Sequence, residues 1–258
     1  MNDTTVSHSL VDSTESITKL IDTIKAIPPG PKPNLFLDLE GVSLSRHGSI
    51  SILAIFVRPN KHVYLVDVHA LHSAAFGTPG DSGVTLKDIL ESPGIIKVFF
   101  DVRNDSDALH HHYGVKLQGI QDVQLMENAT RPPGRRAWLK GLNKCIEYDA
   151  PLSAVDKRRW NLIKEKGLIL FHPSKGGSYQ VFNQRPLDPD VERYCINDVQ
   201  FLPELMERYL CRLSAAWRLK VDDETTRRRG EFRNRRVPGM NRTERRRDFV
   251  SCFVWAVR

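Results

Sequence analysis

The stretch LFLDLE, residues 35–40, places two carboxylates inside an apolar run. Side chains alternate between the two faces of a strand, so Asp38 and Glu40 are expected on one face, with leucines on the other. Carboxylates in apolar surroundings need a compensating partner, and a divalent cation is the partner that best suits their oxygens. The stretch therefore predicts a strand that presents two metal-binding carboxylates.

Two further acidic signatures follow along the chain. Tyr194 and Asp198 are four residues apart, so on a helix they lie on one face, one turn from each other. Asp105 opens a predicted helix over 105–112, with Asp101 and Asp107 as competing candidates nearby. In this order the three signatures suggest one site that holds two metal ions.

Composition places the chain among soluble globular proteins. It has 258 residues, of which 40% are hydrophobic and 27% charged, enough for one main domain with a sizeable core. Its four cysteines form no CxxC pair, which favours a reducing compartment. We find neither a secretory leader nor an apolar stretch long enough to span a bilayer, so we expect an intracellular, soluble protein with no membrane contact.

The net charge of +7 is concentrated in one segment. Residues 227–247 hold ten arginines against Glu231 and Glu244, which leaves 28 basic and 29 acidic residues in the rest of the chain. The body is thus nearly neutral. We expect an arginine-rich tail over 216–258, disordered or ordered by a partner, that contacts phosphates, serves as a nuclear-import signal, or is only a solvated linker.

Hydrophobic periodicity and turn residues give the expected order of elements. A helix around Ile17–Ile24, with a linker to residue 33, precedes the body over 34–215 and packs on it. The alternation predicts an α/β fold, in which three antiparallel strands are followed by alternating helices and strands in a mixed sheet flanked by helices. The expected strands are 34–39, 50–57, 62–68, 95–100 and 120–125, and the expected helices are 85–91, 105–112, 135–147, 153–166 and 188–213.

In several segments the chain resembles the DEDDy branch of the 3′-5′ exonucleases, the ribonuclease D type within the RNase H-like superfamily. Residues 38–40 resemble the first family motif. Residues 97–100 and 104–109, followed by Gly114-Val115, resemble the second. Residues 185–187 and 194–198 resemble the third family motif. The resemblance covers about residues 12–213 and implies an RNase H-like fold with a five-stranded sheet.

The resemblance also implies a chemistry. Asp38, Glu40, Asp105 and Asp198 would hold two divalent cations, Mg²⁺ or Mn²⁺, and Tyr194 would orient the attacking water. Asp105 is preferred over Asp101 and Asp107 because the family register aligns it. Asp122 matches another acidic position of the family and is either a supporting residue of the site or a strand-edge aspartate.

The expected activity is removal of nucleoside 5′-monophosphates from the 3′ end of single-stranded RNA or DNA, with RNA favoured. A basic and aromatic group, Lys157, Arg158, Arg159 and Trp160, is a candidate for nucleic-acid binding or else one face of an ordinary amphipathic helix. The alternative function is a weak or inactive adapter of the same fold that binds RNA or a protein partner. A nuclear or a cytoplasmic location is compatible with either.

Overall fold

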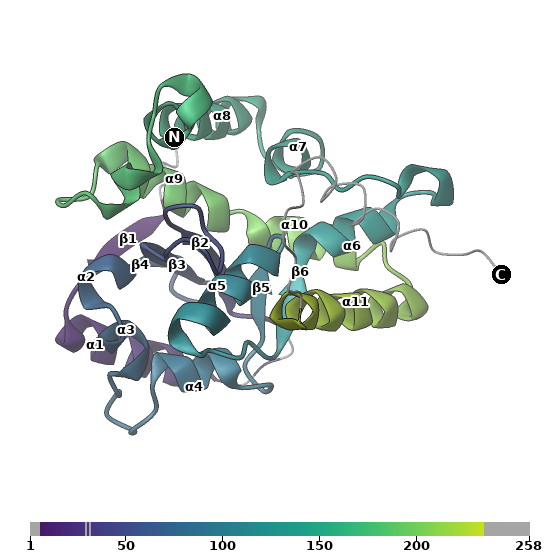
Figure 1. The fold of residues 1–258 in the computed structure, drawn as a ribbon. Helices are drawn as coiled ribbons and strands as arrows, with labels where there is room; N and C mark the ends of the chain where they lie inside the picture. Colours follow the sequence, from purple (N-terminus) through teal and green to yellow (C-terminus); the bar gives the residue numbers. More distant parts are fainter. Residues whose placement is uncertain (1–5, 29, 31, 235–258) are drawn as a thin grey trace.

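A computed structural model describes residues 6–28, 30 and 32–234. Its centre is one six-stranded sheet with the strand order β1-β4-β3-β2-β5-β6 (Figure 1). Strands β2, β3 and β4 form an antiparallel meander, and the pairs β1–β4, β2–β5 and β5–β6 are parallel. The strands are β1 (Ser7–Val11), β2 (Leu35–Glu40), β3 (Ile52–Val57), β4 (His62–Asp67), β5 (Lys97–Phe99) and β6 (Ile120–Asp122).

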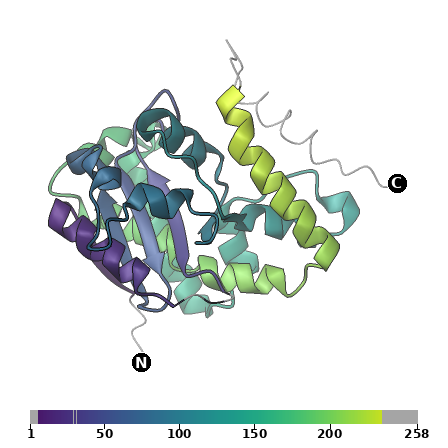
Figure 2. The same cartoon turned by 90° about the horizontal axis from the view of Figure 1, so that it is seen from below.

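Helices cover both faces of this sheet (Figures 1 and 2). One face carries α1 (Thr14–Lys25), α2 (Val68–Leu71), α3 (Ala74–Gly77), α4 (Leu86–Glu91) and α5 (Arg103–Tyr113). The other carries α6 (Val123–Thr130), α7 (Leu142–Tyr148), α8 (Ala154–Phe171), α9 (Pro189–Val199) and α10 (Leu202–Leu210). Helix α11 (Ala215–Asn234) packs against α5, α6 and β6, and the described residues also form the 3₁₀ turns η1 (Pro133–Arg135), η2 (Pro173–Lys175) and η3 (Tyr179–Asn183).

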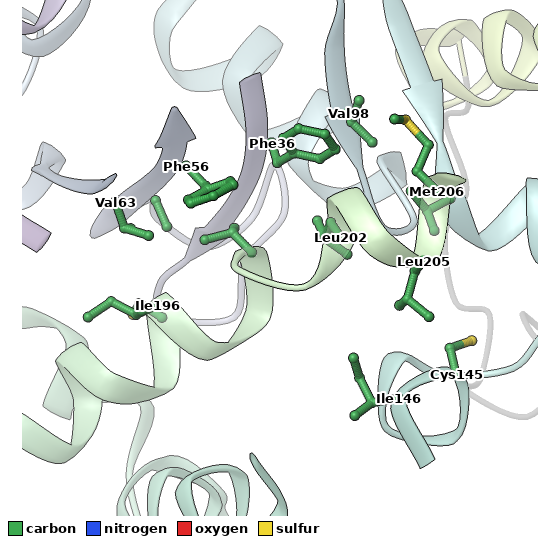
Figure 3. Packing of buried hydrophobic residues seen from close by; sticks show 14 of the residues in the cluster. Phe36, Phe56, Val63, Val98, Cys145, Ile146, Ile196, Leu202, Leu205 and Met206 are labelled. Carbon is green, nitrogen blue, oxygen red and sulfur yellow. The ribbon is translucent and has the colours of Figure 1, made fainter. Parts of the chain in front are cut away.

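Alternation along β2 divides the interior into two cores. Leu35, Leu37 and Leu39 pack with α1, α4 and α5, whereas Phe36 faces the opposite side. There it packs in one cluster with side chains of α9 and α10, such as Leu202 (Figure 3). Since Asp38 and Glu40 share the parity of Phe36, they lie on the α9 side of the sheet.

The expected α/β fold, with its antiparallel meander and flanking helices, is confirmed, but the sheet has six strands where five were expected. The additional strand, β1, pairs in parallel with β4 at the sheet edge. Its sequence SHSLV is short and half polar, and the hydroxyls of Ser7 and Ser9 contact the His62 ring at 2.8 and 2.9 Å. Hydrophobic periodicity does not reveal so short a strand, because its partner lies more than fifty residues away.

Two expected boundaries were wrong at the C-terminal end. The helix expected over 188–213 is interrupted between α9 and α10, where Pro203 occupies the first turn of the new helix. The expected tail also begins too early, because residues up to 234 continue as α11. Residues 235–258 lie outside the described part of the chain.

Among the described residues, we find no helix with both the length and the apolar character needed to cross a bilayer.

Candidate active site

Two carboxylates of the site come from the end of β2. Asp38 pairs with Ala54 and Glu40 with Ile52 in the antiparallel ladder with β3, so the ladder fixes both backbones. Both side chains project to the side of the sheet that α9 covers. This arrangement follows directly from the two-residue spacing in the LFLDLE stretch.

Helix α9 brings the third carboxylate to the same point. Asp198 is 6% exposed, and oxygens of Asp38, Glu40 and Asp198 lie within 4.8 Å of one another. Tyr194, one turn earlier on α9, lines the same cavity. Three hard oxygen donors at this separation suit Mg²⁺ or Mn²⁺ better than a softer metal.

Asp105 lines the same cavity from the first turn of α5, outside the group of three whose oxygens lie within 4.8 Å of one another. Its Oδ1 accepts a hydrogen bond from the Leu39 backbone N–H at 3.2 Å, between the two β2 carboxylates in sequence. Asp105 is 5% exposed and lines the cavity with Asp38, Glu40 and Asp198. We call these four residues the carboxylate site.

The two competing aspartates have arginine partners. Asp107 accepts hydrogen bonds from Arg46 Nε and Nη2, at 3.0 and 2.6 Å to its Oδ1, so it anchors the β2–β3 loop to α5. Asp101 binds Arg103 through both carboxylate oxygens at 2.5 Å and adopts a positive φ of 68° at the turn before α5. Asp101 does line the cavity, but its charge is already compensated.

Asp122 supports the site from behind. It is fully buried and caps α6, accepting N–H bonds from Gln124 and Leu125. It also accepts hydrogen bonds from the backbone N–H groups of Asp101 and Val102, the residues that lead into α5. This carboxylate therefore holds the turn that positions Asp105.

Sequence analysis did not assign Lys164 to the site. From α8, its Nζ donates to both oxygens of Asp198, at 2.7 and 2.5 Å, and to the hydroxyl of Tyr194 at 2.6 Å. The ammonium also lies 3.9 Å from the centre of the Tyr194 ring. The only signal in the sequence was a lysine one turn after Trp160 on a basic helix, which did not point to an acidic cavity.

One ammonium does not neutralise four carboxylates. Burial raises the pKa of Asp38 to about 7, with a further rise from the charge of Asp198. Burial also raises the pKa values of Glu40 and Asp105 well above normal, and the charge of Asp38 adds to both shifts. The cavity, with a volume of about 320 Å³, thus has the electrostatic character of a site for additional cations.

The pKa of Tyr194 is raised well above its normal value, first by burial and then by the charge of Asp198. Its phenol therefore remains protonated at neutral pH. Because the Lys164 ammonium can only donate, the Tyr194 oxygen accepts that bond, and the phenolic O–H can donate to another acceptor in the cavity.

The basic and aromatic group predicted on α8 is only partly suited to binding nucleic acid. Trp160 is 1% exposed and donates its indole N–H to the Asn197 carbonyl at 3.0 Å, so its ring belongs to the core and is not available for stacking with a base. Lys157 donates to the Glu147 carbonyl at 2.9 Å, and Arg158 and Arg159 are exposed. The helical spacing that exposes the arginines turns Trp160 into the core.

A family model described as 3′-5′ exonuclease matches residues 9–213. The chain belongs to this family. It is of the DEDDy, ribonuclease D-like type, as the sequence motifs predicted.

Solved structures with the same fold include RNase D of Trypanosoma brucei in a complex with GMP. This match has a TM-score of 0.68 and 18% identity and covers 96% of this chain and 72% of the other. RNase D of Escherichia coli matches with a TM-score of 0.60 and 18% identity, covering 89% and 51%.

Similar curated proteins include the human piRNA biogenesis protein EXD1, which is 39% identical over 144 residues, or 51% of this chain and 26% of that protein. The Xenopus laevis protein of the same name is 29% identical over 190 residues, or 70% and 38%. The chain thus spans well under half the length of these curated relatives.

Proposed function

We propose that the chain is a metal-dependent 3′-5′ exonuclease that acts on single-stranded nucleic acid with a free 3′ end. RNA is favoured over DNA, and the products are nucleoside 5′-monophosphates. The observation that carries this proposal is the convergence of four carboxylates and a protonated tyrosine in one cavity. The ribonuclease D type of the chain supports the choice of RNA, and a similar fold is known in a complex of Trypanosoma brucei RNase D with RNA U12. An intracellular site of action, nuclear or cytoplasmic, is part of the proposal.

The carboxylate site would hold two Mg²⁺ or Mn²⁺ ions. Its donors are all carboxylate oxygens, and their raised pKa values indicate that the site lacks positive charge. When bound, such ions neutralise charge on the scissile phosphate and acidify water. Asp38, Glu40 and Asp198 hold one another's oxygens close enough to share a ligand, while Asp105 is fixed by the Leu39 N–H.

Tyr194 and Lys164 would organise the remaining polar groups. Lys164 fixes the position of the Tyr194 hydroxyl and leaves its proton to orient the attacking water. The same ammonium donates to Asp198 and so fixes that carboxylate in the cavity. Neither side chain needs to change its protonation state for this positioning role.

The direct test replaces both β2 carboxylates. With Mg²⁺ or Mn²⁺, wild-type protein should shorten a 5′-labelled single-stranded RNA stepwise from its 3′ end, whereas Asp38→Ala/Glu40→Ala should lose this activity, by at least about a hundredfold. A matched control is Asp190→Ala/Glu192→Ala, which removes the same two residue types at the same spacing at the start of α9. Equal cleavage by wild type and the β2 double variant would refute the assignment.

One observation favours the alternative, an adapter of the same fold with weak or no activity. Lys164 already forms an ion pair with Asp198, and a cation that interacts with this carboxylate must compete with it. Retention of all four carboxylates favours the enzyme. Binding of the RNA without degradation across a range of Mg²⁺ and Mn²⁺ concentrations would favour the adapter.

A further inference from the structure

The segment between α6 and α7 runs back beside α6 (Figure 1), where hydrogen bonds from side chains of the helix hold it. We call residues 132–141 the clamped loop. Gln124 and Asn128 lie one turn apart on α6, and Arg131 directly follows the helix, three residues after Asn128. Each donates to backbone carbonyls of the clamped loop, at residues 135, 136, 138 and 140, with distances of 2.6 to 3.2 Å.

A buried charge reinforces the clamp. Glu127 is 1% exposed, forms an ion pair with Arg131, and lies 3.0 Å from Lys140 Nζ. Because the carboxylate is buried, losing either cation would leave charge uncompensated in the interior. Both ends of the clamped loop are therefore held, and four of its carbonyls accept hydrogen bonds from Gln124, Asn128 and Arg131.

At the outer side of the clamped loop stands Trp138, whose surface is 64% exposed. Its backbone carbonyl is bonded to Asn128 and Arg131, so the residue is fixed while its indole faces outward. A large aromatic side chain on a fixed loop offers a flat contact surface at little cost in conformational entropy.

The clamped loop leads directly into the candidate active site. Gly141, its last residue, and Leu142, the next one, both line the cavity that contains the carboxylate site. Gln124, which binds the Lys140 carbonyl, lines it too. Trp138 is thus three residues from the rim of the cavity.

This part of the surface is basic. With the carboxylates that pair with it included, the segment 127–149 contains five basic side chains and three acidic ones, whereas the chain outside this segment and outside 227–247 has 23 basic and 26 acidic residues. Further aromatic and cationic groups belong to this segment or contact it: Lys144 and Tyr148 are exposed, and Arg136 and Trp217 are half-buried. The Arg136 guanidinium stacks 3.9 Å from the Trp217 ring, and Lys144 Nζ lies 5.4 Å from the ring of Tyr148, which is 60% exposed.

We infer that the clamped loop binds the single strand upstream of the nucleotide in the cavity, with a base stacked on Trp138. Aromatic surface next to positive charge is the combination that holds single strands without sequence preference. Phosphates on the 5′ side of that nucleotide would meet the local excess of basic residues, with Arg135 exposed beside Trp138. This inference rests on the proposed function, because it takes the cavity as the place of the 3′ end.

Binding is measured in the absence of metal, using the Asp38→Ala/Glu40→Ala chain as background so that no cleavage occurs. The probe is a 5′-fluorescein oligouridylate of about twelve nucleotides, a length within the range that single-strand sites cover. Adding Trp138→Ala should raise Kd on the order of tenfold, and Trp138→Phe should restore most of the affinity because it keeps an aromatic ring. Leu162→Ala, a change at an equally exposed apolar residue on α8, should leave Kd unchanged.

Substrate length separates this inference from the proposed function. In the active chain, Trp138→Ala should slow degradation of the long oligonucleotide but not of a dinucleotide, which would not reach Trp138. If the oligonucleotide binds equally well with and without Trp138, the inference is wrong even where wild-type protein degrades RNA. If binding depends on Trp138 but no metal supports cleavage, the inference that the clamped loop binds the single strand is supported and the proposed exonuclease activity is refuted.

Discussion

The carboxylate site holds like charges that metal-free protein cannot fully compensate. Asp38 has a pKa of about 7 in the folded chain, against about 3.9 in an unfolded one. A raised pKa means that the folded state binds its proton more tightly. The stability that this proton contributes is complete below pH 4 or so and is lost as pH rises through about 7.

The upward direction of the Asp38 pKa shift predicts how the stabilising effect of divalent ions depends on pH. We expect the rise in melting temperature caused by Mn²⁺ to be small near pH 5.5 and larger near pH 8, since deprotonated carboxylates bind the ion and repel one another without it. Asp38→Asn should reduce this pH dependence because it removes the titrating group. Thermal melts with and without Mn²⁺ at several pH values measure both. An Mn²⁺ effect of equal size at pH 5.5 and 8 would contradict the charge assignment.

Side-chain partners distant in sequence decided what the local pattern left open. Spacing alone placed Asp38 and Glu40 on one face and Tyr194 with Asp198 on another element. It did not choose among the aspartates near α5, because the choice depends on Arg46, which binds Asp107 from 61 residues away, and on Arg228, whose Nη1 lies 3.6 Å from Asp101. The sequence did not identify Lys164 as a site residue for the same reason, since its partners are thirty or more residues away.

At the scale of elements, α11 connects the C-terminal part of the chain to the turn before Asp105. Arg228 is 3% exposed, and its Nη1 donates to Asp122 at 2.9 Å and to Gln124 at 3.2 Å. Arg229 donates to the Leu117 carbonyl at 2.6 Å. Asp122 in turn holds the backbone that leads into α5, so α11 supports the site from behind.

Replacing Arg228 tests this support. Arg228→Ala leaves the Asp122 carboxylate buried with one cation fewer, and we expect a loss of about 3 kcal/mol in the free energy of unfolding. Arg212→Ala, an exposed arginine just before α11, should change it by less than about 0.5 kcal/mol. Urea unfolding of the three proteins gives the comparison. Equal stability of the two variants would show that the buried pair contributes nothing.

The composition of α11 explains why the sequence predicted a tail instead of a helix. Few of its side chains are apolar, and Val221 is among the buried ones. Charge-rich segments with little apolar surface are ordinarily unable to fold alone. Here, the ion pair between Arg228 and Asp122 and a hydrogen bond from Arg229 to the Leu117 carbonyl help to hold the helix, and neither partner is visible in the local sequence.

At the scale of the whole molecule, the boundary between body and tail does not coincide with the change in composition. The arginine-rich segment begins at residue 227, yet Arg228 and Arg229 belong to the contacts of the folded body. Another seven arginines, with Glu244 and Asp248, lie in residues 235–258. Composition therefore does not separate the arginines that contact the folded body from those that lie outside the described residues.

Two truncations test the two groups of arginines separately, those that contact the body and those after residue 234. A chain that ends at residue 226 loses both arginine contacts and should melt on the order of 5 to 10 °C lower, whereas a chain that ends at residue 234 keeps them and should melt like the full chain. Both truncations remove positive charge, so both should weaken the salt dependence of oligonucleotide binding. Thermal melts and binding at several salt concentrations measure the two effects independently. A large drop in melting temperature for the chain that ends at 234 would move the boundary of the folded body further toward the C-terminus.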